Sequence, residues 1–94
     1  MELTLITLSA DGPATGHLLD GGRVGDLMWA ASRPGELLEH VSTQAGPGWL
    51  HLGVFTLTSE QHTAGSAALA ICRRALAASP LLRGWRIAAV RPGA

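Results

Sequence analysis

The stretch Gly48–Thr58, GWLHLGVFTLT, decides the fold that the sequence predicts. Leu, Val, Phe, Trp and Thr dominate it, and these residue types suit a pleated, half-buried strand. Pro47 and Gly48 start the stretch abruptly, and it is too short for a free-standing helical pattern. The sequence therefore predicts a central β-strand that runs directly into the longest helix of the chain.

Alternate residues of this predicted strand point to opposite faces of a sheet. One face would carry Leu50, Leu52, Val54, Thr56 and Thr58, and the other Trp49, His51, Gly53, Phe55 and Leu57. Neither face bears a charge unless His51 is protonated, whereas a strand with one solvated face alternates apolar with charged residues. We therefore expect both faces of this strand to be covered.

The length predicts a single domain, 1–94, which the order of elements given below makes an α+β domain. Its core is expected to be adequate but thin, because a short chain buries only about two-thirds of its unfolded surface. Apolar residues make up 47% of the chain and charged residues 15%, which indicates a surface hidden by a partner. The net charge is zero, so no overall charge draws the chain to nucleic acid or to an anionic membrane. The absence of Lys and the frequent Ala, Gly and Leu favour a bacterial genome rich in G and C.

Three features predict a cytoplasmic protein without a disulfide. The N-terminal residues MELTLITLSADG lack the basic region of a signal peptide. No apolar run approaches the ~20 residues of a membrane-spanning helix. Cys72 is the only cysteine, so the chain has neither an internal disulfide nor a cysteine metal cluster.

Residues 14–31 leave several alternatives open. His17–Leu19 fits a short strand or one helical turn, and Asp20–Gly22 is a turn signal. Leu27–Ala31 fits a strand or the beginning of a helix. A strand pair across the glycine-rich turn is one of these alternatives.

Cap and stop signals predict a first helix between Ser32 and Gly46. Ser32 has the residue type of an N-cap, Pro34 suits a first turn, and Gly46 with Pro47 suits a stop. The apolar stripe of this helix would be Leu37, Leu38 and Val41.

A second helix is predicted from a capping box at Thr58–Gln61 to about Ser79. Its buried side is largely alanine, so the helix can lie close to the sheet. That side would consist of Ala64, Ala68, Ile71, Cys72, Ala75 and Leu76.

Strands at 3–9 and 85–90 complete the order, and residues 91–94 are expected to form a loose tail. This order predicts a small ferredoxin-like (βαβ-αβ) open sheet with two helices on one face, its remaining strand either in 14–31 or absent. Every predicted strand is largely apolar on both faces, and so large an exposed patch would be unusual on a monomer. We therefore expect a homodimer that packs sheet on sheet.

The tripeptide Pro47-Gly48-Trp49 at the start of the central strand, together with the element order, resembles the dimeric α+β-barrel proteins. This group includes small cofactor-free monooxygenases. The resemblance covers one tripeptide and a coarse order of elements, and no catalytic residue is carried over from it.

His51 is the candidate for chemistry on the central strand, because Gly53 leaves room beside it. A ligand pocket between the sheet and the helices would be lined by His51, Trp49, Phe55, Trp29 and Met28. The favoured alternative is a structural histidine, since one titratable group without a visible partner does not make a catalytic site. No histidine pair has metal-ligand spacing, so neither a metal nor a cofactor is expected.

The C-terminal quarter carries the only charge asymmetry, with five arginines and no acidic residue after Glu60. Candidates for docking an acidic peptide or protein partner are Arg73, Arg74, Arg83 and Arg86, and Arg91 follows them. A solvated face is the favoured alternative. Nucleic-acid binding is less favoured, because no aromatic–basic interleaving appears, and it would need the five arginines to form one stripe.

The favoured function is therefore a non-catalytic homodimeric interaction module, an accessory protein of a bacterial pathway. The alternative is a small-molecule-binding protein, or a cofactor-free enzyme of the dimeric α+β-barrel kind, with a pocket near His51.

Overall fold

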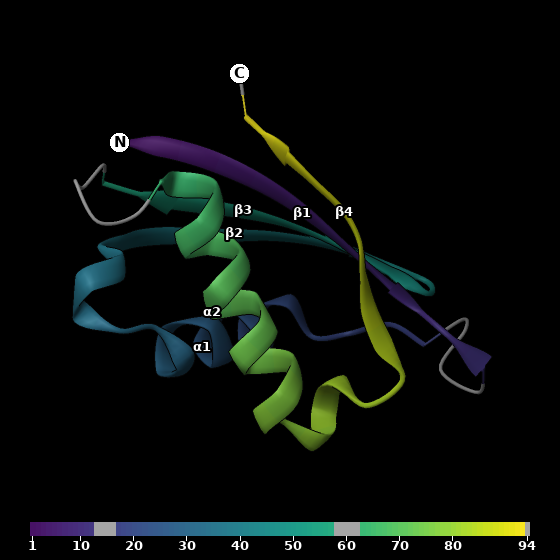
Figure 1. Cartoon of the computed structure of the whole chain (residues 1–94). Coiled ribbons are helices and arrows are strands. Elements are labelled where there is room, and N and C mark those ends of the chain that lie inside the picture. Colours follow the sequence, from purple (N-terminus) through teal and green to yellow (C-terminus); the bar gives the residue numbers. More distant parts are fainter. Residues whose placement is uncertain (13–16, 58–62, 94) are drawn as a thin grey trace.

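The computed structural model describes residues 1–12, 17–57 and 63–93. These residues form four strands and two α-helices, and the α+β class is confirmed (Figure 1). The order is β1 (Glu2–Ala10), α1 (Gly21–Ala31), β2 (Leu38–Gly46), β3 (Trp49–Thr56), α2 (Ala64–Ala78) and β4 (Trp85–Pro92). Short 3₁₀ turns, η2 (Pro34–Glu36) and η3 (Pro80–Leu82), precede β2 and β4.

The strands form one open antiparallel sheet in the order β2-β3-β1-β4. Strands β1 and β3 are central, so the prediction of a central strand within 48–58 is confirmed. Both helices lie on the same side of the sheet, where α2 contacts β1, β3 and β4, and α1 contacts β2 and α2 (Figure 1). Within the described ranges, no helix is long and apolar enough to cross a membrane.

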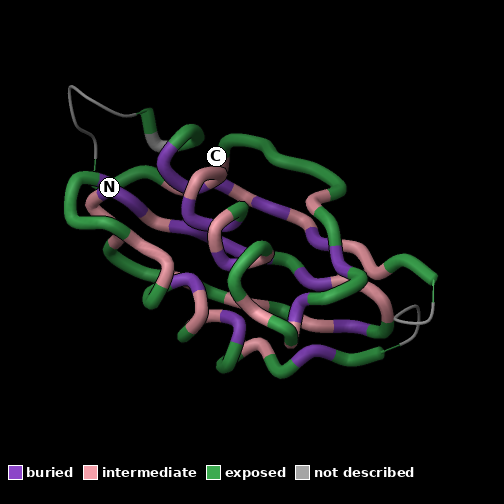
Figure 2. The backbone as a smooth tube through the Cα atoms, turned by 60° about the horizontal axis from the view of Figure 1, so that its bottom comes forward, coloured by how far each residue is buried: buried purple, intermediate pink, exposed green. Residues whose placement is uncertain are grey.

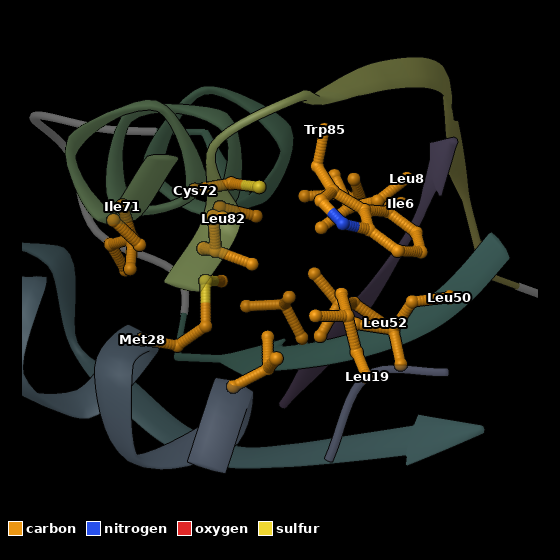
Figure 3. Packing of buried hydrophobic residues seen from close by; sticks show 14 residues of the cluster. Ile6, Leu8, Leu19, Met28, Leu50, Leu52, Ile71, Cys72, Leu82 and Trp85 are labelled. Atoms are coloured by element: carbon orange, nitrogen blue, oxygen red, sulfur yellow. The ribbon is translucent and has the colours of Figure 1, made fainter. Parts of the chain in front are cut away.

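The core lies between the sheet and the helices, as the buried stretches in Figure 2 show. Every second residue of the central strands points into it, and the almost fully buried ones are Ile6, Leu8, Leu50, Leu52 and Val54. Helix α2 adds mostly small residues, namely Ala67, Ala68, Ile71, Cys72 and Ala75. Trp85 and Leu82 close the core near the start of β4 (Figure 3).

The first helix lies earlier in the chain than the sequence predicted. Helix α1 occupies Gly21–Ala31, and Asp20, which was interpreted as part of a turn, is its N-cap. The Asp20 Oδ1 accepts a hydrogen bond from the backbone N–H of Arg23 at 3.3 Å. Val24 and Met28, four residues apart, bury one side of the helix.

The segment predicted as the first helix is instead η2 followed by strand β2, so that prediction was wrong. Leu37 ends the 3₁₀ turn with a φ of 54°, in the left-handed region. From His40 onward the side chains of β2 alternate between the two faces of the sheet. Polar His40, Ser42 and Gln44 pair with residues of β3 that point away from the helices, so they lie on the face opposite the helices. The remaining strand of the sheet therefore lies at 38–46 and not within 14–31.

The later elements agree more closely with the sequence. The predicted capping box at Thr58–Gln61 lies outside the described residues, and the N-cap of α2 is Thr63, whose hydroxyl accepts from the Ser66 N–H at 3.2 Å. Strand β4 runs to Pro92, and the Gly93 N–H donates to the Leu3 carbonyl at 2.8 Å. The expectation of a loose tail from Arg91 is therefore wrong for residues 91–93.

Candidate functional site

The face of the sheet opposite the helices, here called the helix-free face, is built from four cross-strand rows. In each row, directly paired residues run from β2 through β3 and β1 toward β4. The row at one end is His40, Phe55 and Leu3; the next is Ser42, Gly53, Leu5 and Arg91; then Gln44, His51, Thr7 and Ala89; and finally Gly46, Trp49, Ser9 and Arg86.

The two central strands and the two edge strands contribute different chemistry to this face. Leu3, Leu5 and Phe55 from β1 and β3 form an apolar strip and are half-buried. The edge strands contribute polar residues in each of the rows, such as Ser42 from β2 and Arg91 from β4. The expectation of strands that are apolar on both faces therefore applies to the centre of the sheet and fails at its edges.

A groove of about 460 Å³ opens on the helix-free face over the row that contains Gly53. Its apolar lining comes from Leu3, Leu5 and Phe55, and its polar lining includes Thr7, Ser42, Gln44, His51 and Arg91. A Cβ atom at Gly53 would lie 2.4 Å from the Ser42 Oγ, so glycine leaves the space that this hydroxyl takes. A second hollow of about 350 Å³ also includes Leu3 and Phe55 among its lining residues.

His51 lies at the polar side of the groove. Its Nδ1 is 3.1 Å from the Thr7 hydroxyl directly across the strand pair, and its ring centroid is 4.7 Å from that of Trp49. The Nε2 atom makes no hydrogen bond with a described residue. No carboxylate lines the groove among the described residues, so this part of the chain gives His51 no acidic partner of the kind that orients a catalytic base.

The structure separates the five residues that the sequence grouped into one pocket. His51, Trp49 and Phe55 share the helix-free face, because odd-numbered residues of β3 point away from the helices. Met28 is buried in the core on the opposite side, and Trp29 is 46% exposed on helix α1. The expected pocket between sheet and helices is therefore not the one observed, and the groove beside His51 lies on the other side of the sheet.

The arginines of the C-terminal quarter are scattered. Arg73 and Arg83 are exposed on α2 and after η3, whereas Arg86 and Arg91 lie on the helix-free face of β4. Arg86 forms an exposed ion pair with Asp11, at 3.1 Å. These positions do not form the single stripe that the nucleic-acid hypothesis required.

Arg74 was predicted as a docking residue, but its side chain is bound to other residues of the same chain. Its Nε donates to the Ala31 carbonyl at 2.9 Å, and its Nη2 pairs with Glu36, whose side chain is 5% exposed. Burial alone would raise the pKa of Glu36, but the hydrogen bonds from Arg74 and from the Arg33 backbone, with both guanidinium charges, hold it below its usual value. This pair fastens α2 to the connection between α1 and β2.

Two other kinds of site can be assessed from the side chains. Cys72 is buried as predicted, and burial raises the pKa of its thiol to about 12, which suits a packing residue and not a nucleophile. Within residues 1–12, 17–57 and 63–93, no three His, Cys, Asp or Glu side chains gather as metal ligands would.

Sequence reasoning missed most of the groove lining, including the polar residues Thr7, Ser42, Gln44 and Arg91. Thr7 is a polar residue between the apolar neighbours Ile6 and Leu8, a period-two signal that marks the outward face of a strand. Ser42 lies between Val41 and Thr43, so this signal is weaker there. Arg91 had been placed in the tail, and only the pairing of β4 with β1 brings it opposite Leu5.

Comparisons of the chain with protein-family models, with curated proteins and with solved structures found no match.

Proposed function

We propose that this chain is a non-catalytic interaction module that pairs with a second copy of itself through the helix-free face, as a cytoplasmic accessory protein of a bacterial pathway. The observation that carries this proposal is the apolar strip of Leu3, Leu5 and Phe55, which neither α1 nor α2 covers (Figure 1). We also propose a ferredoxin-like topology, which the element order and the strand order β2-β3-β1-β4 support.

The size of this face is compatible with a stable pair. Four strands about 4.8 Å apart, each about eight residues long at ~3.3 Å per residue, give a flat footprint of roughly 500 Å². Two copies packed face to face would then bury roughly 1,000 Å², which is the lower limit for a specific interface. Burial of the half-exposed apolar strip would supply the favourable free energy, and the polar edge rows would form the rim.

The experiment compares the mass in solution of three proteins by light scattering at micromolar concentration. The parent chain is expected to have twice the monomer mass of 9.7 kDa. Phe55→Arg, which places a charge in the apolar strip, is expected to be monomeric. Trp29→Arg is the matched control, because it removes an exposed aromatic residue from the helix side, and it is expected to remain dimeric.

A monomeric parent chain would contradict the proposed pairing. A dimer that Trp29→Arg dissociates and Phe55→Arg leaves intact would place the interface on the helices. Circular dichroism on each variant confirms that a change in mass does not come from unfolding.

The groove beside His51 favours a second candidate function, a small-molecule-binding protein or a cofactor-free enzyme of the dimeric α+β-barrel kind. Its volume of about 460 Å³ lies within the roughly 300–1,000 Å³ of ligand pockets, and its lining mixes apolar residues with a few polar groups. The lack of a carboxylate beside His51 favours binding within this pair of alternatives. Ligand-induced shifts of the amide resonances of Gly53 and His51 would test it.

A further inference from the structure

We infer that the groove on the helix-free face binds a small amphipathic anion, a carboxylate carried on a flat apolar body, with the carboxylate held by Arg91. This inference rests on the second candidate function, because it names the class of ligand for the same groove.

Arg91 gives the groove its charge. It lies opposite Leu5 in the row that contains Gly53. Among the described residues of the lining it is the only permanently charged side chain, and none of them is a carboxylate. Arg86 on the same strand pairs with Asp11, whereas Arg91 forms no ion pair with a described residue. A guanidinium group binds a carboxylate with two parallel hydrogen bonds, so an anionic ligand group is the complement of this site.

The neighbouring row supplies neutral hydrogen-bonding groups next to this charge. The Thr7 hydroxyl on β1 and the His51 ring on β3 lie directly opposite each other. Gln44 on β2 pairs with His51 from the other side. Thr7 is two residues from Leu5, which faces Arg91, so a carboxylate at Arg91 lies at the border between the charged row and this polar row. The free Nε2 of His51 can accept or donate a further hydrogen bond to the ligand.

In the row on the other side of Gly53, the residues of the two central strands are apolar and match an apolar body of the ligand, whereas His40 stands at the edge of this row. Phe55 and Leu3 face each other there, and the hollow at this end continues along the same two side chains. A flat apolar group can lie against the Phe55 ring and Leu3, beside the Ser42 hydroxyl, which takes the space that a side chain at position 53 would need. A bare inorganic anion would leave this apolar surface in water, and a neutral apolar ligand would leave Arg91 without a partner.

The test uses 2-naphthoate and its neutral isostere 2-naphthamide as probes, followed by two-dimensional NMR of the backbone amides. Naphthoate is expected to shift the amides of Thr7, Gly53 and Arg91 and to bind about tenfold more tightly than naphthamide, as one charge-assisted hydrogen-bonded pair would give. Arg91→Gln is expected to remove most of this difference. Arg73→Gln, which removes an exposed arginine on α2, is the matched control and is expected to keep it.

The outcomes separate this inference from the function on which it rests. Equal binding of the two probes, measured at these amides, would contradict the proposal that the ligand is an anion, and so would equal effects of the two arginine variants. Either result would still agree with a groove that binds a neutral small molecule. No shift with either probe would overturn both. The probes are added at a chain concentration where light scattering shows a monomer, because pairing through Leu3, Leu5 and Phe55 would cover the groove that these residues line.

Discussion

The two faces of the sheet are made by the same strands and differ in what covers them. On the helix side, Leu50, Leu52 and Val54 are completely buried against the helices. On the helix-free face, their neighbours Trp49 and Phe55 remain half-buried. One strand therefore provides the core with its even-numbered residues and a groove with its odd-numbered ones, so stability and binding can be changed separately. Four sets of measurements on variants test this division.

The largest expected difference is in thiol reactivity. Cys72 on the helix side is buried, and a pKa of about 12 in place of 9.0 lowers its thiolate fraction about a thousandfold near neutral pH. A thiol introduced on the helix-free face by Ser42→Cys, in a Cys72→Ala background, should react with Ellman's reagent at the rate of an exposed thiol in dilute protein. Similar reaction rates for the folded parent chain and the folded double variant would contradict the burial of Cys72.

Truncation of leucines on the two faces should have unequal effects on the free energy of unfolding. Leu52→Ala is expected to cost about 3 kcal/mol, because it leaves a cavity in the fully buried core. Leu5→Ala on the helix-free face should cost about 1 kcal/mol at concentrations where the chain is monomeric. Urea unfolding measures both, and equal losses would mean that the two faces are equally covered.

The two ion pairs provide a smaller contrast. Arg74→Ala leaves the buried Glu36 carboxylate without its partner and is expected to cost about 2 kcal/mol, whereas Arg86→Ala should cost less than about 0.5 kcal/mol because that pair is exposed. The pKa of Glu36 is lower in the folded state, so its pairing stabilises the fold above the ordinary value of 4.5. The effect of Arg74→Ala should therefore shrink as the pH falls below 4.5, and an effect that grows in acid would contradict the assignment.

Gly53→Ala is expected to have the smallest effect on stability, a change below about 1 kcal/mol. The added Cβ would meet the Ser42 Oγ, the end of a small side chain that can rotate, and the nearest carbon of Leu3 would be 3.4 Å away. The same variant should weaken naphthoate binding, because the Ser42 hydroxyl that the added Cβ displaces is part of the groove lining. A loss of several kcal/mol in urea unfolding would show that this part of the face is packed as tightly as the core.

The sequence predicted the elements whose signals are unambiguous. Strand β3 is rich in β-branched and aromatic residues and follows Pro47 and Gly48, so it was placed correctly. Helix α2 has a long apolar stripe, and its end was placed correctly, whereas it begins at Ala64, later than predicted. The segments 21–31 and 38–46 were misassigned. Two glycines, which disfavour a helix, begin α1, and an extra residue at Glu39 breaks the alternation at the start of β2.

The site was predicted in part. The alternation along β3 correctly put Trp49, His51 and Phe55 on one face. It did not show which face the helices cover, because both faces of this strand are apolar. Arg91 could not be placed, because the extra residue Ala88 in β4 shifts which side chains point away from the helices, and pattern alone does not reveal such a bulge.

The most direct test of the central claim is an isotope-filtered nuclear Overhauser experiment on a mixture of labelled and unlabelled chains. The account predicts intermolecular signals between the Leu3 and Leu5 methyl groups of one copy and the Phe55 or Trp49 ring of the other. Intermolecular signals confined to residues of α1 and α2, or none at a concentration where light scattering shows a dimer, would contradict pairing through the helix-free face.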